Sequence, residues 1–218
     1  MKKRRQLGFS ALELLIVVAI GLTLMAMVAP LVTTALNMHR LRGAGGDYLT
    51  LLQSARMRAV TADQYYPVNV APGAPGAAAA NTFNAYIDLN GSGAYDPGEP
   101  GVTFNPLIVV QPAGNAPATA NLYTQFLPNI GVNRVVINPN PWGPTFGARG
   151  LPCQASAAVG GTCSYTSAAP NPAGLPVAFE TFMQNIQTGV WEAVTVNPSG
   201  RVRQWHYNVA TATWQPLN

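Results

Sequence analysis

Charge is scarce in this 218-residue chain, and the little that it carries is unevenly placed. Only 9% of the residues are charged, and the net charge of +4 comes entirely from the N-terminal segment. Without residues 1–8, which hold four of the 12 Lys and Arg residues, eight arginines face eight acids and the net charge is zero. The isoelectric point of about 9.3 therefore does not indicate a nucleic-acid-binding surface, and any anion site must be a local cluster.

Histidine is also scarce, which bears on catalysis. The chain has two, His39 and His206, and the sequence places no Ser or Cys nucleophile motif and no pair of acids near either one. A lone histidine is more often a packed or surface residue than part of a catalytic site. We therefore expect that this chain is not an enzyme.

Cysteine occurs only at Cys153 and Cys163, ten positions apart in a stretch rich in Gly, Ala and Ser. Outside the cytoplasm we expect a disulfide between them, which would stabilise a loop of this size by roughly 2–3 kcal/mol. The alternative is a reactive thiol pair. The sequence favours the disulfide, because no basic neighbour is present to lower the pKa of a thiol.

One long apolar run lies near the N-terminus. Residues 14–36 carry no charge, and a helix of that length, at ~1.5 Å per residue, spans the core of a bilayer. Basic residues 2–5 place the preceding segment on the cytoplasmic face. Glu13 requires a partner, since a carboxylate at membrane depth costs about 2.5–3.5 kcal/mol. Cleavage after the small residue Gly8 would leave the helix attached, unlike cleavage of an ordinary secretory signal.

The order Gly8-Phe9-Ser10-Ala11-Leu12-Glu13, followed by the apolar run, resembles the class III signal of type IV pilins and type II secretion pseudopilins. The resemblance implies that a prepilin peptidase cuts after Gly8 and methylates Phe9. It also implies that Glu13 pairs with the N-terminal amine of a subunit during filament assembly. Pro30 falls where helices of this family usually carry a proline. The alternative is an uncleaved membrane anchor with an incidental glutamate.

The rest of the chain, with most of the 21 Gly and 19 Pro, has the composition of a loop-rich β domain. One apolar stripe has helical spacing, and we expect it to face a sheet; its members are Tyr48, Leu51, Leu52, Ala55 and Ala59. Gly43, Gly45 and Gly46 should loosen this helix without necessarily ending it, and Pro67 should end it. Arg56 and Arg58 lie off the stripe and are expected on a solvated face.

Short strands separated by Pro, Asn and Gly turns are predicted through the remainder of the chain, and residues 71–81 are predicted to form a surface loop. The C-terminal hairpin is the clearest of them, because Asn197-Pro198-Ser199-Gly200 suits a type I turn. The predicted strands are Tyr65–Val70, Phe83–Ile87, Val102–Phe104, Leu107–Gln111, Leu122–Phe126, Val132–Asn138, Val177–Met183, Gly189–Val196 and Arg201–Tyr207.

Segments of the body resemble the GspH/FimT group of minor pilins and pseudopilins: TFGARGLP (145–152), AVTVNPSGRVRQW (193–205), SARMRAV (54–60) and the acidic loop that follows. The resemblance implies an α+β fold in which a long N-terminal helix, half in the membrane and half amphipathic, packs on antiparallel β-sheets. It divides the chain into a leader (1–8), a transmembrane and filament helix (9–42) and a globular β-rich domain (43–218).

The acidic loop, residues 88–99, has the spacing of a twelve-position calcium loop. Oxygen ligands at positions 1, 3, 5, 7, 9 and 12 would come from Asp88, Asn90, Ser92, the Ala94 carbonyl, Asp96 and Glu99. The flanks are predicted as strand and turn, not as the two helices of an EF-hand. The alternative is therefore a turn in which Asp88 and Asn90 hydrogen-bond the backbone.

The second candidate site is Gly200-Arg201-Val202-Arg203, where period-two alternation places Arg201, Arg203, Trp205 and Tyr207 on one face. Two guanidiniums can bind phosphates, and the adjacent aromatic ring can stack on a base or support an arginine. The segment resembles the G-R-x-R motif with which FimT-like minor pilins bind DNA. The alternative is structural, with Trp205 and Tyr207 in the core and the arginines at an exposed edge.

Together these patterns predict a subunit anchored by one helix in the inner membrane, with its globular domain in the periplasm or outside the cell. Its expected partners are the prepilin peptidase, other pilins or pseudopilins and, through the GRVR segment, DNA. Calcium is the one cofactor that the sequence suggests. Three roles remain open: a structural subunit of a type IV pilus, a DNA receptor, and a tip pseudopilin of type II secretion with no DNA role.

Overall fold

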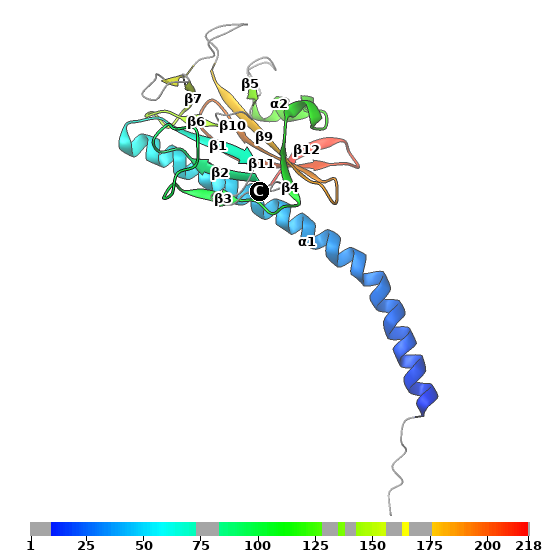
Figure 1. The fold of residues 1–218 in the computed structure, drawn as a ribbon. Helices are drawn as coiled ribbons and strands as arrows, with labels where there is room; N and C mark the ends of the chain where they lie inside the picture. Colours follow the sequence, from blue (N-terminus) through cyan, green and yellow to red (C-terminus); the bar gives the residue numbers. More distant parts are fainter. Residues whose placement is uncertain are drawn as a thin grey trace, which may run out of the picture.

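The computed structural model describes residues 10–72, 83–127, 135–137, 143–155, 163–165 and 176–217, and Figure 1 shows their arrangement. The predicted processing residues Gly8 and Phe9 lie outside the described residues. So does most of the predicted surface loop, from residue 73 onward.

A single helix, α1 (Ala11–Ala62), runs from the apolar N-terminal segment into the globular domain. It begins after Ser10, whose hydroxyl accepts a hydrogen bond from the N–H of Leu12, and ends at Asp63, where φ is +53°. The N-terminal half of α1 extends away from the domain (Figure 1). Its large apolar side chains from Leu12 to Leu36 are exposed, and burial begins at Asn37. Within the described residues, α1 is the one helix long and apolar enough to cross a membrane. It continues through the three glycines at 43–46.

The strands of the described residues form two sheets. One has the order β3-β2-β1-β6-β7-β8, and the other has the order β12-β11-β10-β9-β4, with β5 also paired to β9. The pairings are antiparallel except that of β5 with β9, which is parallel. The first sheet contains β1 (Tyr66–Pro72), β2 (Phe83–Ile87), β3 (Gly101–Thr103), β6 (Thr145–Phe146), β7 (Pro152–Ala155) and β8 (Cys163–Ser164). The second contains β4 (Ile108–Gln111), β5 (Val135–Ile137), β9 (Ala178–Asn185), β10 (Trp191–Val196), β11 (Val202–Asn208) and β12 (Thr213–Pro216).

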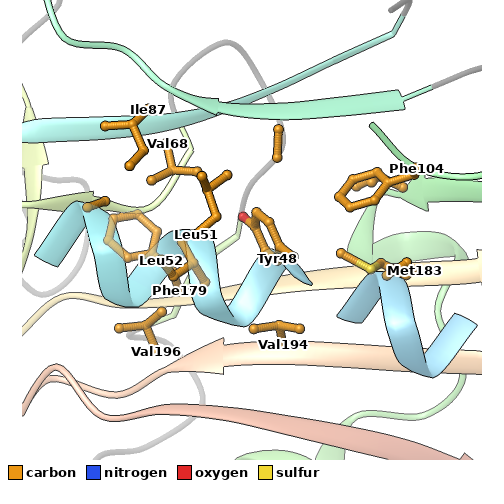
Figure 2. Packing of buried hydrophobic residues seen from close by; sticks show 14 of the residues in the cluster. Tyr48, Leu51, Leu52, Val68, Ile87, Phe104, Phe179, Met183, Val194 and Val196 are labelled. Atoms are coloured by element: carbon orange, nitrogen blue, oxygen red, sulfur yellow. The ribbon is translucent and has the colours of Figure 1, made fainter. Parts of the chain in front are cut away.

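The C-terminal half of α1 lies between the two sheets and forms the main core with them. Figure 2 shows the helix with Val68 and Ile87 of the first sheet on one side and Val194 and Val196 of the second on the other. The predicted apolar stripe is confirmed, since all five of its members are buried. The hydroxyl of Tyr48 also shares a buried hydrogen bond of 3.2 Å with that of Thr181 on β9. The α+β architecture expected from the sequence, a long helix on antiparallel sheets, is therefore confirmed.

The opposite face of the second sheet is covered by a short helix, α2 (Ala120–Phe126), which follows a 3₁₀ turn at Ala113–Asn115. Leu122 and Phe126 of α2 pack with Phe182, Trp205 and Trp214 in a second cluster. The strand predicted at Leu122–Phe126 is therefore wrong. A five-residue apolar segment does not distinguish the two structures, and the four-residue spacing of Leu122 and Phe126 places both on one helical face.

The C-terminal hairpin is confirmed. β10 and β11 pair in register from Glu192 with His206 to Val196 with Val202. The N–H of Gly200 donates to the carbonyl oxygen of Asn197 at 2.8 Å and closes the turn between them. The last predicted strand ended at Tyr207, so the sequence prediction missed β12. This strand pairs with β11 and contributes Trp214 to the second cluster.

Candidate functional site

Three segments far apart in the sequence meet at the β10–β11 turn (Asn197–Gly200). Arg56 of α1 donates from Nη1 to the carbonyl oxygen of Gly200 at 3.0 Å. A Cβ on Gly200 would lie 2.6 Å from the carbonyl oxygen of Gly150, and φ at Gly200 is +77°. The turn therefore requires glycine at this position, both for its left-handed backbone and for its contact with residue 150.

This contact corrects one prediction about the helix. Arg56 is half-buried and bonded to the turn, so the solvated face expected for it is wrong, whereas Arg58 is exposed as expected. The segments SARMRAV, TFGARGLP and NPSGRVR, each noted for its resemblance to the GspH/FimT group, are thus in contact with one another through Arg56, Gly150 and Gly200.

Arg201 and Arg203 lie on a cavity of about 180 Å³ between the turn and α2, which we call the α2 cavity. Its lining residues are Gln125, Phe126, Thr195, Asn197, Arg201 and Arg203. Within the described part of the chain, neither guanidinium has a hydrogen bond or an ion pair with another side chain. Two arginines that line one cavity with no acidic partner attract an anion such as a phosphate.

Trp205 packs against Arg203 from the core of the domain. Its side chain is fully buried, and its indole Nε1 donates to the hydroxyl of Thr195 at 2.8 Å. The guanidinium carbon of Arg203 lies 5.5 Å from the centre of the Trp205 ring, a cation–π distance. Trp205 therefore lies in the core, as the structural alternative has it, and also supports Arg203, whereas its buried ring is not available to stack on a base.

The short helix α2 is held firmly over the second sheet. The carbonyl oxygen of Trp214 accepts hydrogen bonds from the side-chain amides of Asn121 and Gln125, each at 3.1 Å. Tyr123 donates to Glu180 of β9 at 2.9 Å. Burial raises the pKa of Glu180 to about 7, although the hydrogen bond from Tyr123 acts in the opposite direction. Sequence reasoning missed this wall of the cavity because it predicted a strand there.

A further arginine lies beside the turn. Arg149, next to Gly150, is exposed, and its guanidinium carbon is 5.4 Å from the centre of the Tyr165 ring. Tyr165 follows the predicted disulfide, which is confirmed between Cys153 and Cys163 with a Cα–Cα distance of 5.5 Å. The alternative of a reactive thiol pair is therefore wrong. Arg149 was not predicted as a site residue, although it lies in one of the segments that carried the resemblance.

A second buried acid lies where α1 crosses β10 and β11. Gln204 donates from Nε2 to Glu192 at 2.8 Å and to the carbonyl oxygen of Arg42 at 3.1 Å. Burial raises the pKa of Glu192 to about 7, against the opposing effects of Gln204 and Arg42. Burial, with the charge of Arg42, lowers the pKa of His206 on the same face. His39 is exposed on α1.

The acidic loop is closed by its own hydrogen bonds. Asp88 is almost fully buried, and its two oxygens accept from the N–H groups of Gly91, Ser92 and Gly93 at 2.6, 3.1 and 2.8 Å. The two oxygens of Glu99 accept from the N–H groups of Leu89 and Asp96, at 2.8 and 3.0 Å.

The remaining predicted calcium ligands bond to one another. Asp96 accepts from the Asn90 amide at 2.7 Å and from the Ser92 hydroxyl at 3.1 Å, and that hydroxyl also reaches the Ala94 carbonyl oxygen at 3.0 Å. In the described residues, no group of three or more His, Cys, Asp or Glu side chains is placed to hold a metal ion. These contacts are those of the hydrogen-bonded turn that the sequence left as the alternative, and calcium binding remains a prediction.

Of the predicted site residues, Gly200, Arg201, Arg203 and Trp205 are brought together around one turn. Glu13 is exposed in the first turn of α1, and Pro30 lies within the same helix. Comparison with protein-family models, with curated proteins and with solved structures finds no match to this chain.

Proposed function

We propose that this chain is a minor pilin or pseudopilin of the GspH/FimT type, cut after Gly8 by a prepilin peptidase and assembled into a filament through α1. The observation that supports the proposal is the division of α1 into two parts. Its C-terminal part is buried between the sheets, whereas the part from Leu12 to Leu36 exposes apolar side chains that the domain does not cover. Lipid, or the same helix of other subunits, supplies that cover.

Assembly through α1 is heterologous, since one subunit's helix packs on different surfaces of its neighbours, and such contacts extend into a filament if the rotation does not close. Glu13 supports this assignment. It is an exposed carboxylate in the first turn of a helix whose following turns are apolar. A carboxylate in that environment needs a positive partner, which the free N-terminal amine of a processed subunit provides.

The processing test uses full-length chain in cells with a prepilin peptidase and an assembling filament. Gly8→Ala should leave a membrane-held precursor that does not enter filaments. The matched control is Gly21→Ala, since an added Cβ at Gly21 meets nothing within 4 Å in the described chain. Mass spectrometry of the wild-type protein should find methylated Phe9 at its N-terminus. A mature protein that begins after residue 36 contradicts the proposal.

The assembly test uses Glu13→Ala in the same cells. This variant should be processed normally and yet be depleted from purified filaments, because its role is in subunit pairing and not in folding. Normal incorporation removes the pairing role of Glu13 without affecting the processing result.

Among the possible functions of the filament, one observation favours DNA binding, with Arg201 and Arg203 in contact with the phosphates. Both arginines line the α2 cavity, and within the described chain neither guanidinium has an acidic partner, in a protein whose net charge without residues 1–8 is zero. The rival role is that of a tip pseudopilin in type II protein secretion, with no DNA contact. Deletion of the gene separates them, since loss of DNA uptake supports the first role and loss of protein secretion supports the second.

A further inference from the structure

The α2 cavity offers more than two positive charges. Opposite Arg201 and Arg203 it is bounded by α2, which contributes Phe126 and Gln125. Its volume of about 180 Å³ exceeds several times the ~30 Å³ that one water molecule occupies in the liquid. The cavity therefore admits a small group with an apolar surface as well as a charged one.

The hydrogen-bonding groups of the cavity include an acceptor. The amide nitrogen of Gln125 donates one of its two N–H groups to the carbonyl oxygen of Trp214 at 3.1 Å, which leaves the second N–H as a donor and Oε1 as an acceptor. The hydroxyl of Thr195 accepts from Trp205 at 2.8 Å, which leaves its proton to donate. A phosphate group carries acceptors only, so it can use the donors of the cavity but not the acceptor Gln125 Oε1. The edge of a nucleobase carries donors and acceptors together, and so matches both groups.

The helix that carries Gln125 is fixed in place before any ligand arrives. Trp214 donates from Nε1 to the carbonyl oxygen of Ala118 at 3.1 Å and from its backbone N–H to Asn121 at 3.2 Å. With the bond between Tyr123 and Glu180, these contacts join α2 to β9 and β12. A ligand that enters the cavity does not have to order this wall, which favours tight binding for a given set of contacts.

We propose that the α2 cavity receives one unstacked nucleobase of single-stranded DNA, with Arg201 and Arg203 on the phosphates beside it. This inference rests on the DNA-binding role proposed above and names the form of DNA that the site selects. In a duplex the bases are paired and stacked, so they reach the cavity only at the cost of unpairing. The chain therefore binds a single strand more tightly than a duplex of the same length, by on the order of ten-fold.

The test measures binding of the full-length chain in lipid nanodiscs by fluorescence anisotropy. The probes are a labelled oligothymidine and a labelled duplex of the same length, at one salt concentration. Gln125→Glu places a charge in the cavity and should abolish the preference for the single strand. Thr124→Glu is the matched control, because it adds the same charge at the neighbouring exposed position, which does not line the cavity. Thermal unfolding checks that both variants keep the fold.

The outcomes separate the inference from the function on which it rests. Loss of the single-strand preference in Gln125→Glu, with the preference kept in Thr124→Glu, supports the base cavity. Equal affinity of the wild-type chain for both probes overturns the inference and leaves DNA binding intact. Identical behaviour of the two variants also overturns it. If the wild-type chain binds neither probe, the DNA-binding role fails, and the inference fails with it.

Discussion

The hydrogen bond from Arg56 to the carbonyl oxygen of Gly200, 3.0 Å long, joins the helix that carries the apolar N-terminal segment to the turn that carries Arg201. The two residues are 144 positions apart in the sequence. Because α1 is continuous, the position of the arginine pair is set relative to the same helix whose N-terminal part is long and apolar enough to cross a membrane. The candidate site therefore has a fixed place relative to the axis of α1.

The first prediction concerns the glycine in this contact. Gly200→Ala should destabilise the chain by about 1–2 kcal/mol for the left-handed backbone alone, and by more because the added Cβ meets the Gly150 carbonyl oxygen at 2.6 Å. Gly189→Ala is the control, since φ there is +69° but an added Cβ meets nothing within 4 Å in the described chain. Thermal unfolding should show the larger loss for Gly200→Ala. Equal losses would mean that the contact with residue 150 has no energetic weight.

The second prediction concerns the salt dependence of DNA binding. Each phosphate contact on duplex DNA contributes about 0.9 to the slope of log affinity against log salt. Arg201→Gln with Arg203→Gln should therefore lower that slope by about two and remove most of the binding, measured by DNA titration of the chain without the basic residues 1–8 at several salt concentrations. With zero net charge outside residues 1–8, wild-type binding should be micromolar or weaker and independent of sequence.

A change at Trp205 separates folding from binding in the same experiment. Its fully buried ring and its bond to Thr195 predict that Trp205→Ala loses about 3–5 kcal/mol of stability. The arginine variants should lose much less stability, about 0.5–1 kcal/mol, since within the described chain the guanidiniums have only the cation–π contact of Arg203 with Trp205. If the double arginine variant binds DNA as well as wild type, the DNA-receptor role is excluded.

The third prediction concerns calcium. If residues 88–99 bind the ion, calcium at 100 times its Kd stabilises the folded chain by about 2.7 kcal/mol relative to the calcium-free chain. The Tm should rise accordingly. Asp88→Asn and Glu99→Gln should each abolish the shift. Magnesium serves as the control, since it requires a smaller, octahedral site. A wild-type Tm that is unaffected by millimolar calcium would assign the loop to the hydrogen-bonded turn alone.

The fourth prediction concerns pH. Burial raises the pKa of Glu180 and that of Glu192 to about 7 in the folded state, whereas an unfolded glutamic acid keeps its ordinary pKa of about 4.3. The folded state therefore binds these protons more tightly. The stabilisation is complete below about pH 4.3 and is lost as the pH rises through 7. Between pH 5 and pH 8 the loss is on the order of 2 kcal/mol for each carboxyl, and each such loss lowers the Tm by about 4–8 °C.

The control for the pH prediction is Glu180→Gln with Glu192→Gln, which should flatten this part of the pH profile. His206 acts in the opposite direction. Its pKa is lowered in the folded state, so its contribution is lost as the pH falls below about 6.5. The difference between the wild-type and double-variant profiles isolates the two carboxyls. A difference that does not change with pH would contradict the prediction.

Local patterns in the sequence predicted much of the fold. The stripe from Tyr48 to Ala59 identified the buried face of α1, because helical spacing alone determines which side chains share a face. The turn at Asn197–Gly200 identified the hairpin for a similar reason, since its residues define their own backbone geometry. The segment Leu122–Phe126 could not be assigned in this way, because Trp214 and Phe182, which complete its packing, come from distant parts of the chain.

The candidate site likewise contains residues that local spacing predicts and residues that only the tertiary packing brings together. Arg201 and Arg203 were predicted because they share one strand with period-two spacing. Arg56, Arg149 and Gln125 were not, since their approach to the turn depends on how α1, the loop at Gly150 and α2 fold together. In the acidic loop, the spacing of oxygen-bearing side chains is visible in the sequence, but spacing alone does not reveal that backbone N–H groups of the loop donate to the oxygens of Asp88 and Glu99.

The position of α1 between the two sheets has a mechanical consequence. A pull along the exposed half of the helix is carried without a joint into the segment from Leu41 to Ala59, which contacts both sheets. Extraction then requires that the contacts of Tyr48, Leu52 and their neighbours slide past both sheets together, in shear, instead of separating one after another. A subunit drawn along its helix axis therefore resists as a single unit.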